Sequence, residues 1–275
     1  MGWCSPMKLI GETWRELWRV NRGGGILTLA FWYTLITSLY QYLVASRLGP
    51  SLPKSLIQMV ANPGAQAVMP HLSAALWLKL ALVYLTFLII IIPFGVGGLY
   101  GGIAWALKEN PRYTGFLAFF RFGYQNFWRA LEQILLAILY GLVAFGVITA
   151  LIAALSAFSP SPSVLSVVAV FVAFGVMLWM IGTLLYWFGR TFATQDSPAR
   201  GFKPAFKWSV THLGSLYANI FPLVGLIFAA VLVTLFLARV IPVLGAVLLV
   251  LVLGMVAPAF MGVYALELYQ QFSNP

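Results

Sequence analysis

Six stretches of the chain are apolar over a length that crosses a lipid bilayer. The hydrocarbon core of a bilayer is about 30 Å thick, so a helix needs roughly 20 apolar residues to span it. The six stretches of this length cover residues 26–46, 76–107, 130–158, 164–188, 216–238 and 243–269. They do not show the alternation of apolar and polar residues that is typical of strands in a membrane β-barrel. We therefore expect an all-α integral membrane protein with six transmembrane helices.

The composition excludes an ordinary water-soluble protein. Only 8% of the 275 residues are charged and 62% are apolar, whereas a soluble domain is about one-quarter charged. So few charged side chains do not cover a soluble surface of this size. We expect the whole chain, residues 1–275, to form a single membrane domain.

The basic residues cluster on one side of the predicted spans. The N-terminal segment, the second loop and the fourth loop each contain four Lys or Arg residues, and all six acidic residues fall on the same side. Because an excess of Lys and Arg marks cytoplasmic loops, we predict that both termini are cytoplasmic. The net charge of +10 then reflects orientation and attraction to anionic lipid, and no nucleic-acid partner is expected.

Two of the basic segments share a motif. Residues 115–122 and 201–208 both read Gly-Phe, three residues, Phe, a basic residue and an aromatic residue, with no gap and 86 residues apart. The N-terminal segment is a looser copy, in which Ile10, Trp14 and Arg15 occupy the two phenylalanine positions and the basic position. Aromatic residues on one side of a helix with basic residues at its flank are typical of a helix in the membrane interface.

This motif predicts an internal repeat. Each repeat is an interfacial amphipathic helix followed by a two-span hairpin. The alternative is that each basic cytoplasmic loop carries aromatic residues independently, as membrane interfaces favour. The three predicted repeats cover residues 7–107, 112–188 and 199–269.

The layout resembles a group of poorly characterised bacterial six-span membrane proteins, which are similar to the membrane domain fused to some glycerophosphodiester phosphodiesterases. The patches that carry the resemblance are Pro93-Phe94-Gly95 through Tyr100-Gly101-Gly102, the region of Gly115-Phe116 and Trp128-Arg129, and a weaker echo at Gly201-Phe202. The resemblance implies a multi-pass protein of the bacterial plasma membrane. It does not carry over a phosphodiesterase activity, because the sequence shows no catalytic domain of that kind.

Some residues are candidates for lipid contact or for movement within the spans. Basic side chains of the predicted interfacial helices are suited to anionic headgroups, and ionisable residues or prolines inside spans are functional hypotheses. Ordinary helix kinks and interfacial anchoring are the alternatives. The candidate headgroup contacts are Arg15, Arg19, Arg121, Arg129, Lys203 and Lys207. The candidate polar or hinge positions are Pro93, Glu132, Gln133, Asn219 and Pro258.

Two local spacings add further expectations. Glu132 follows Arg129 by three residues, a spacing that permits an ion pair on a helix. Gly97 and Gly98 lie four residues before Gly101 and Gly102, a small-residue pattern that lets helices approach closely. The pattern is compatible with tight packing inside one subunit or with a mobile or dimerising helix.

The sequence predicts no catalytic, cofactor-binding or metal site. The chain has one cysteine, Cys4, and its two histidines, His71 and His212, are far apart in sequence, so a Cys/His metal site is unsupported. No predicted span combines a nucleophile with a base or pairs two carboxylates. We therefore expect that the protein is not an enzyme and needs no cofactor.

Two classes of function remain. One is a transport-related protein, such as a permease, a lipid-handling protein or a membrane subunit of a transport system, with its site among the second, fourth and sixth spans. The other is a structural or regulatory scaffold that binds a protein partner, a second copy of the chain or anionic lipid through its basic cytoplasmic helices. Kinked, glycine-rich spans favour transport by a small margin, whereas the lack of charge at mid-membrane favours the scaffold.

Overall fold

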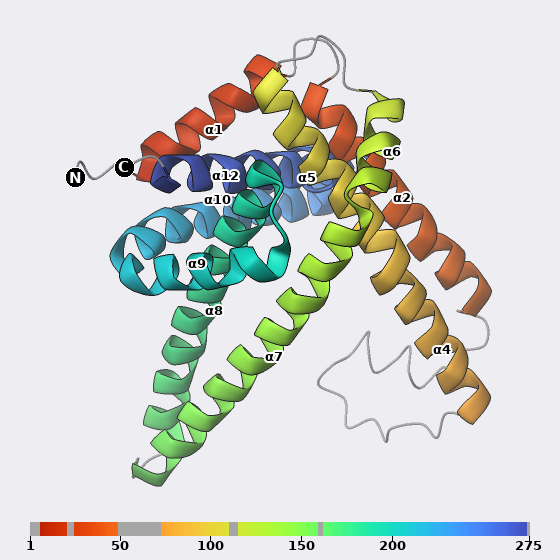
Figure 1. Cartoon of the computed structure of the whole chain (residues 1–275). Helices are drawn as coiled ribbons and strands as arrows, with labels where there is room; N and C mark the ends of the chain where they lie inside the picture. Colours follow the sequence, from red (N-terminus) through yellow and green to blue (C-terminus); the bar gives the residue numbers. More distant parts are fainter. Residues whose placement is uncertain (1–5, 21–24, 49–72, 110–114, 159–161, 274–275) are drawn as a thin grey trace.

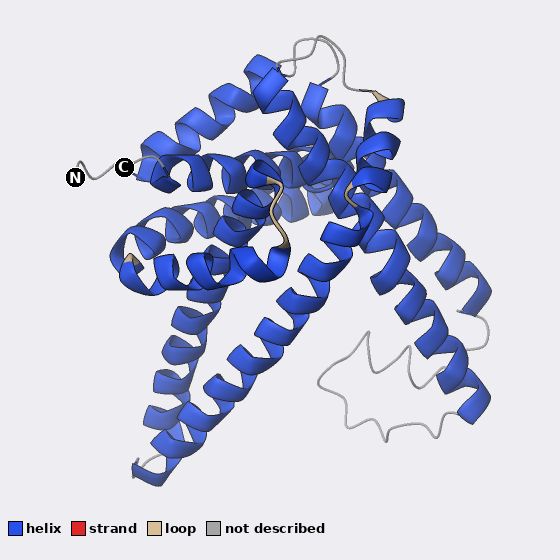
Figure 2. Cartoon of the chain, viewed as in Figure 1, coloured by secondary structure: helices blue, strands red, loops and turns tan. Residues whose placement is uncertain are grey.

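The computed structural model describes residues 6–20, 25–48, 73–109, 115–158 and 162–273. In these residues the chain consists of helices joined by short loops, and it contains no strand (Figure 2). The predicted all-α class is therefore confirmed for the described part of the chain.

The described helices fall into two groups by length. The short helices are α1 (Pro6–Val20), α6 (Phe116–Gln125) and α9 (Pro198–Thr211). Each of them precedes a pair of long helical segments. In chain order, the long helices are α2 (Gly25–Leu48), α4 (Ala74–Thr86) continued by α5 (Ile92–Glu109), α7 (Phe127–Phe158), α8 (Pro162–Thr194), α10 (Leu213–Val240), and α11 (Pro242–Leu251) continued by α12 (Ala257–Ser273).

Five of the described helices are long and apolar enough to cross a membrane, so the chain is a polytopic membrane protein. They cover Ala74–Glu109, Phe127–Ala154, Val167–Thr194, Leu213–Leu237 and Val252–Ser273. The first predicted span, residues 26–46, lies within α2, a helix of 24 residues that is not among these five. Polar and aromatic side chains lower the hydropathy of α2: Trp32, Tyr33, Thr34, Thr37, Ser38, Tyr40 and Gln41.

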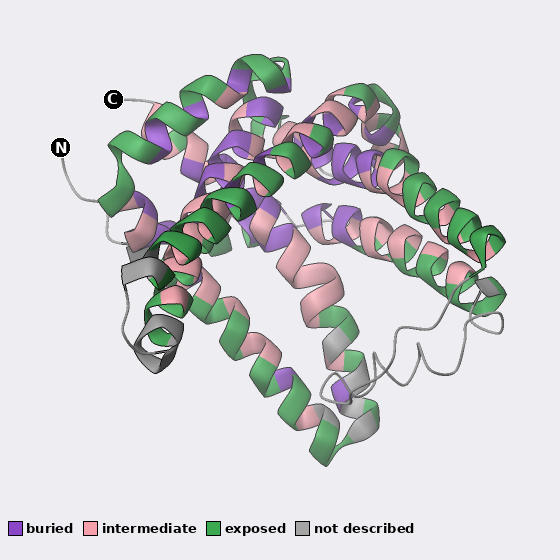
Figure 3. Cartoon of the chain, turned by 90° about the horizontal axis from the view of Figure 1, so that it is seen from below, coloured by how far each residue is buried: buried purple, intermediate pink, exposed green. Residues whose placement is uncertain are grey.

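In the described residues, the long helices form hairpins that meet at one end and splay apart at the other (Figures 1 and 3). One hairpin joins α2 to α4 and α5, the second joins α7 to α8, and the third joins α10 to α11 and α12. The short helices α1, α6 and α9 pack on the end where the hairpins meet. We call these three helices the collar.

The core of the protein lies at the collar end. Buried residues gather where the hairpins meet (Figure 3), whereas α4, at a distal end, has no buried residue. In the centre, α12 packs against α8 and α5, and Ile103 of α5 and Tyr264 of α12 are fully buried. Gly189 of α8 is so close to the carbonyl group of Ala265 that a Cβ atom has no room. The space between α5, α8 and α12 is thus filled by side chains at this end.

The distal parts of the hairpins expose large apolar side chains. Leu142 and Phe145 of α7 are 64% and 69% exposed, and Phe236 of α10 is 67% exposed. In water, such a surface would associate or aggregate. Lipid tails cover it without a free-energy penalty, because they are as apolar as leucine.

The glycine pattern of α5 serves packing within the chain. A Cβ atom on Gly98 would lie 2.8 Å from the Phe119 ring and 2.9 Å from the Phe119 carbonyl oxygen, and one on Gly101 would overlap the side-chain amide of Asn126. The collar helix α6 therefore lies directly on the backbone of α5. The glycine spacing thus allows tight packing inside one subunit, which is one of the two outcomes expected from it.

Candidate functional site

The collar helices each bury one face against the hairpins. In α1, the buried residues recur every three or four positions, namely Leu9, Thr13, Leu17 and Val20. In α6 they are Phe119 and Gly123, and in α9 they are Pro198, Gly201, Ala205, Trp208 and Ser209. This periodicity is that of an amphipathic helix, whose opposite face is left for solvent or headgroups.

The outward faces of the collar combine basic and aromatic side chains. Trp14 and Trp18 of α1 are about half exposed, with their rings 5.7 Å apart. Tyr124 of α6 is 82% exposed. The Arg121 guanidinium lies 5.9 Å from the centre of the Phe122 ring. Such mixed faces are typical of the membrane interface, where Trp, Tyr, Lys and Arg gather.

The candidate headgroup residues differ in how they are engaged. Arg15, Arg121, Lys203 and Lys207 are exposed and form no salt bridge in the described part of the chain. Arg19 is exposed but donates a 2.7 Å hydrogen bond to Glu16. Exposed cations without an acidic partner keep their full attraction for anionic lipid, worth about 1 kcal/mol each near a membrane surface.

Arg129, the sixth candidate, holds the connection between α8 and α9. Its Nη1 donates to Asn126 Oδ1 at 2.7 Å and to Gln195 Oε1 at 2.5 Å, and its Nη2 donates to the Gln195 carbonyl oxygen at 2.9 Å. Gln195 has a φ of +61°, a left-handed conformation that a residue with a Cβ adopts at a free-energy cost. The fork of Arg129 stabilises this conformation, so Arg129 acts inside the protein.

Glu132 binds the start of α9. Its Oε1 accepts a hydrogen bond from the backbone N–H of Ala199 at 3.1 Å and one from the Ser197 hydroxyl at 3.3 Å. The first N–H groups of a helix have no partner within the helix, and a carboxylate there also interacts favourably with the helix dipole. The Arg129–Glu132 ion pair that the spacing permits is not formed, because both side chains are directed to the α8–α9 connection.

The ends of α6 and α9 are built alike. Asn126 ends α6 with its backbone N–H and its Nδ2 bonded to the Phe122 carbonyl, at 2.9 and 3.0 Å. His212 ends α9 with its backbone N–H 2.9 Å and its Nδ1 3.2 Å from the Trp208 carbonyl. In both places the side chain that ends the short helix bonds to the carbonyl four residues earlier. A long helix starts at the next residue.

Gln133 and Asn219 lie buried just after these turns. Gln133 is 0% exposed, and neither polar atom of its side chain has a hydrogen-bond partner among the described residues. Asn219 is 4% exposed, and its Oδ1 likewise has no partner there. Asn219 donates through Nδ2 to the Ser215 carbonyl, and its backbone carbonyl accepts from the Tyr264 hydroxyl. Both amides therefore lie in the packed interior of the protein.

Pro93 and Pro258 each follow a π-helical turn by two residues. The turns are Phe87–Ile91 (η2), between α4 and α5, and Val252–Val256 (η3), between α11 and α12. Proline has no N–H and its ring clashes with the carbonyl four residues earlier, so the α-helical ladder is interrupted. The sequence predicts an interruption at both prolines, but not that a wider turn precedes each.

The helix α2 supplies hydrogen bonds to both interrupted helices. Thr34 Oγ1 donates to the carbonyl of Gly254, four residues before Pro258. Tyr40 donates to the Val83 carbonyl at 2.7 Å, and its ring stacks on Phe87 with centroids 5.3 Å apart. Side chains of neighbouring helices are a known means of satisfying a carbonyl that proline frees within a membrane, as at Gly254. The Val83 carbonyl also accepts the backbone N–H of Phe87, so Tyr40 adds a second bond to it.

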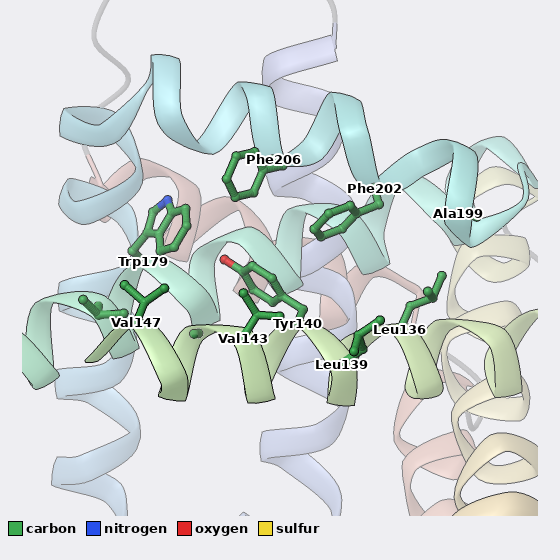
Figure 4. A pocket seen from close by; sticks show the side chains of 11 residues that line it. Leu136, Leu139, Tyr140, Val143, Val147, Trp179, Ala199, Phe202 and Phe206 are labelled. Atoms are coloured by element: carbon green, nitrogen blue, oxygen red, sulfur yellow. The ribbon is translucent and has the colours of Figure 1, made fainter. Parts of the chain in front are cut away.

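An apolar cavity of about 540 Å³ lies between α7, α8 and α9. Four aromatic rings, those of Tyr140, Trp179, Phe202 and Phe206, converge in it (Figure 4), with neighbouring centroids 5.5 to 6.0 Å apart. The remaining lining residues are aliphatic: Leu136, Leu139, Val143, Ala144, Val147, Val176 and Ala199. The sequence does not predict this cavity, because its walls depend on how three successive helices pack against one another.

The chain matches no protein-family model, and neither curated proteins nor solved structures give a significant match. The predicted resemblance to bacterial six-span proteins therefore stays a prediction.

Proposed function

We propose that the protein is a six-span, lipid-handling membrane protein that binds anionic phospholipids along its collar. In this proposal the collar faces the cytoplasm, both termini are cytoplasmic and the protein resides in a bacterial plasma membrane. The observation that carries the proposal is the division of each collar helix into a buried apolar face and an outward face with basic and aromatic side chains. It needs neither catalysis nor a cofactor.

The role of α2 supports a sixth span. Its polar side chains are what keep its hydropathy low, and two of them, Thr34 and Tyr40, donate to carbonyls of the flanking helical segments. A helix placed between two apolar segments, bonded to both, belongs at the same membrane depth as its neighbours. The polarity of α2 therefore favours contact with other helices and not exclusion from the bilayer.

Matching helix ends support an internal repeat. The ends of α6 and α9, at Gln125 and Thr211, are 86 residues apart, the same offset as in the sequence motif. At this offset Asn126 corresponds to His212, and the buried amide of Gln133 corresponds to that of Asn219. We propose that the second and third repeats derive from one duplicated unit, with α1 and its hairpin as a more divergent copy.

One observation favours the alternative, a structural or regulatory scaffold. The centre between α5, α8 and α12 is filled at the collar end, with Ile103 and Tyr264 fully buried. A solute path along the axis between the hairpins would require this packing to open. A lipid path needs no such opening, since lipids have access to grooves on the outer surface, and for this reason we favour lipid handling.

Lipid analysis in native polymer nanodiscs tests the proposed lipid preference. The protein is extracted from a bacterial membrane together with its surrounding lipid, and the anionic fraction is compared with that of the bulk membrane. We expect enrichment of anionic lipid with the wild-type chain. It should decline in the combined variant Arg15→Gln, Arg121→Gln, Lys203→Gln and Lys207→Gln. The matched control is Arg47→Gln and Arg239→Gln, at the opposite ends of the hairpins. Equal anionic fractions in nanodisc and bulk membrane would contradict the proposal.

Two further measurements address orientation and lipid movement. On a Cys4→Ser background, a membrane-impermeant thiol reagent should modify Ala75→Cys in intact cells and leave Ser197→Cys unmodified until the cells are opened. Reconstituted liposomes then separate lipid handling from the scaffold. Faster transbilayer movement of a fluorescent phospholipid supports the former, and movement at the rate of protein-free liposomes supports the latter.

A further inference from the structure

The cavity under α9 has the shape and chemistry of a lipid site. We propose that it binds one acyl chain of an anionic glycerophospholipid, with the phosphate of that lipid at Lys203 and Lys207. This inference rests on the proposed function and names the site and the ligand class more closely.

The cavity is accessible from the lipid phase. Leu139, Val143 and Val147 line it and are also 57%, 58% and 49% exposed on α7. A chain of the surrounding bilayer therefore enters sideways, without crossing a protein barrier. The volume of about 540 Å³ lies within the range of roughly 300–1,000 Å³ typical of small-molecule pockets.

The aromatic cluster forms the roof of the cavity and part of its wall. Phe202 and Phe206 extend from α9 toward α7, and Tyr140 extends from α7 toward α9 (Figure 4). Their rings and the Trp179 ring pack against one another, with centroids 5.5 to 6.0 Å apart. Aromatic side chains have few rotatable bonds, so an apolar occupant gains contact area against them at low entropic cost.

The polar groups indicate which occupant fits. Lys203 and Lys207 are exposed and directly follow Phe202 and Phe206 in α9, so the two lysines lie one above the other on a face roughly 100° around the helix from the rings that roof the cavity. In the described residues neither lysine forms a salt bridge. The phosphate of an anionic glycerophospholipid supplies the acidic partner that the two lysines lack.

The binding of α9 to α7 keeps the cavity in place. Glu132 fixes the first turn of α9 through the N–H of Ala199, which itself lines the cavity. Trp187 Nε1 donates to the Pro198 carbonyl at 2.9 Å. The roof of the cavity is thereby attached to both of the helices that form its walls.

Photo-crosslinking tests the site directly. The probe is phosphatidylglycerol with a diazirine in one acyl chain, added to phosphatidylcholine liposomes that contain the full-length protein, and the labelled peptides are mapped by mass spectrometry. We expect the label on residues 136–147 and 199–206, with unlabelled phosphatidylglycerol competing better than phosphatidylcholine. This measurement on the wild-type chain does not depend on the folding of any variant.

Neighbouring residues of α7 provide a matched pair of variants. Val143→Trp fills the cavity, whereas Leu142→Trp places the same ring at an equally exposed position that does not line it. Displacing two methylene groups, at about 0.8 kcal/mol each, lowers affinity roughly tenfold. Labelling of the site should fall about tenfold in Val143→Trp and stay unchanged in Leu142→Trp. The preference for phosphatidylglycerol should disappear in Lys203→Gln with Lys207→Gln, but not in Arg15→Gln with Lys108→Gln.

Several results would overturn the site. These are label spread evenly over the exposed helices, equal labelling of Val143→Trp and Leu142→Trp, equal competition by both lipids, or crosslinks at these residues to a second copy of the chain. Anionic enrichment in nanodiscs without labelling of the cavity would refute the site and leave the proposed function intact. The absence of both would refute both.

Discussion

The carboxylate of Glu132 in α7 accepts a hydrogen bond from the backbone N–H of Ala199, in the first turn of α9, at 3.1 Å. A residue near the start of a long membrane helix thus caps a short helix that begins 66 residues after it. Together with the Arg129 fork on Gln195, this bond ties the collar to the hairpin beneath it. The position of α9, and of the cavity that it covers, depends on these two side chains.

Removing the Glu132 carboxylate should loosen α9. Glu132→Ala leaves the Ala199 N–H without its acceptor, and loss of a helix cap costs about 1 kcal/mol. We expect a lower thermal unfolding midpoint in detergent and faster hydrogen exchange in residues 198–203, with a smaller effect in Glu132→Gln. Asp196→Ala is the control, because its carboxylate is exposed and lies 3.8 Å from the half-buried Arg190, and long pairs with an exposed partner contribute little. Equal effects of Glu132→Ala and Asp196→Ala would show that the cap is unimportant.

Replacing Arg129 with lysine should disturb the α8–α9 connection although the charge is kept. A lysine ammonium does not reproduce the planar fork that reaches both the side chain and the carbonyl of Gln195. Hydrogen exchange is expected to increase at residues 195–197, where the left-handed backbone loses its support. Arg121→Lys, on the exposed face of α6, serves as the control and should behave as wild type. Unchanged exchange in Arg129→Lys would mean that Gln195 holds its conformation unaided.

Gly98→Val should disrupt the contact between α5 and α6. The added side chain meets the Phe119 ring and carbonyl within 3 Å, and overpacking of this kind costs about 1–3 kcal/mol. A marked loss of thermal stability or of folded protein is expected. The comparison is Gly141→Val in α7, where a Cβ atom has no neighbour within 4 Å. If both valine variants were equally stable, α6 would not lie against α5 as described.

Thr34→Val should destabilise the interrupted helix α11–α12. The substitution keeps the shape of the side chain and removes the donor to the Gly254 carbonyl, a loss of roughly 1 kcal/mol within a membrane. Thr149→Val is a suitable control, because Thr149 donates only to the Phe145 carbonyl of its own helix.

A double-mutant cycle identifies the cause. Pro258→Ala restores an N–H four residues after Gly254, so the penalty of Thr34→Val should shrink in the Pro258→Ala background. Additive penalties would show that Thr34 does not serve the carbonyl that Pro258 frees. Thermal unfolding of the four proteins in the same detergent gives the comparison.

Much of the fold is predictable from local patterns in the sequence. Apolar length alone places the long helices; the predicted span 130–158, for example, lies within α7, Phe127–Phe158. The Gly-Phe motif places the collar helices α6 and α9, and the glycine spacing marks α5 as a helix that others approach closely. These features are local because the helical period and the bilayer thickness act on contiguous residues.

The candidate site is less predictable because tertiary packing decides it. The sequence predicts for Arg129 a headgroup contact or an ion pair with Glu132, whereas its partner Gln195 lies 66 residues away. The aromatic cluster joins Tyr140 and Trp179, from opposite arms of one hairpin, to Phe202 of the collar. No spacing rule relates these positions, and the cavity depends on how α7, α8 and α9 pack against one another.

The depth of the collar in the bilayer tests the central claim of the account most directly. Nitroxide labels are placed at Lys207→Cys in α9, Arg121→Cys in α6 and Leu142→Cys in α7, on a Cys4→Ser background in phosphatidylglycerol-containing liposomes. Relative relaxation by oxygen and by a water-soluble nickel complex then reports the depth of each label. We predict that positions 121 and 207 lie in the headgroup layer and position 142 in the hydrocarbon. Values of bulk water at both 121 and 207 would contradict the account.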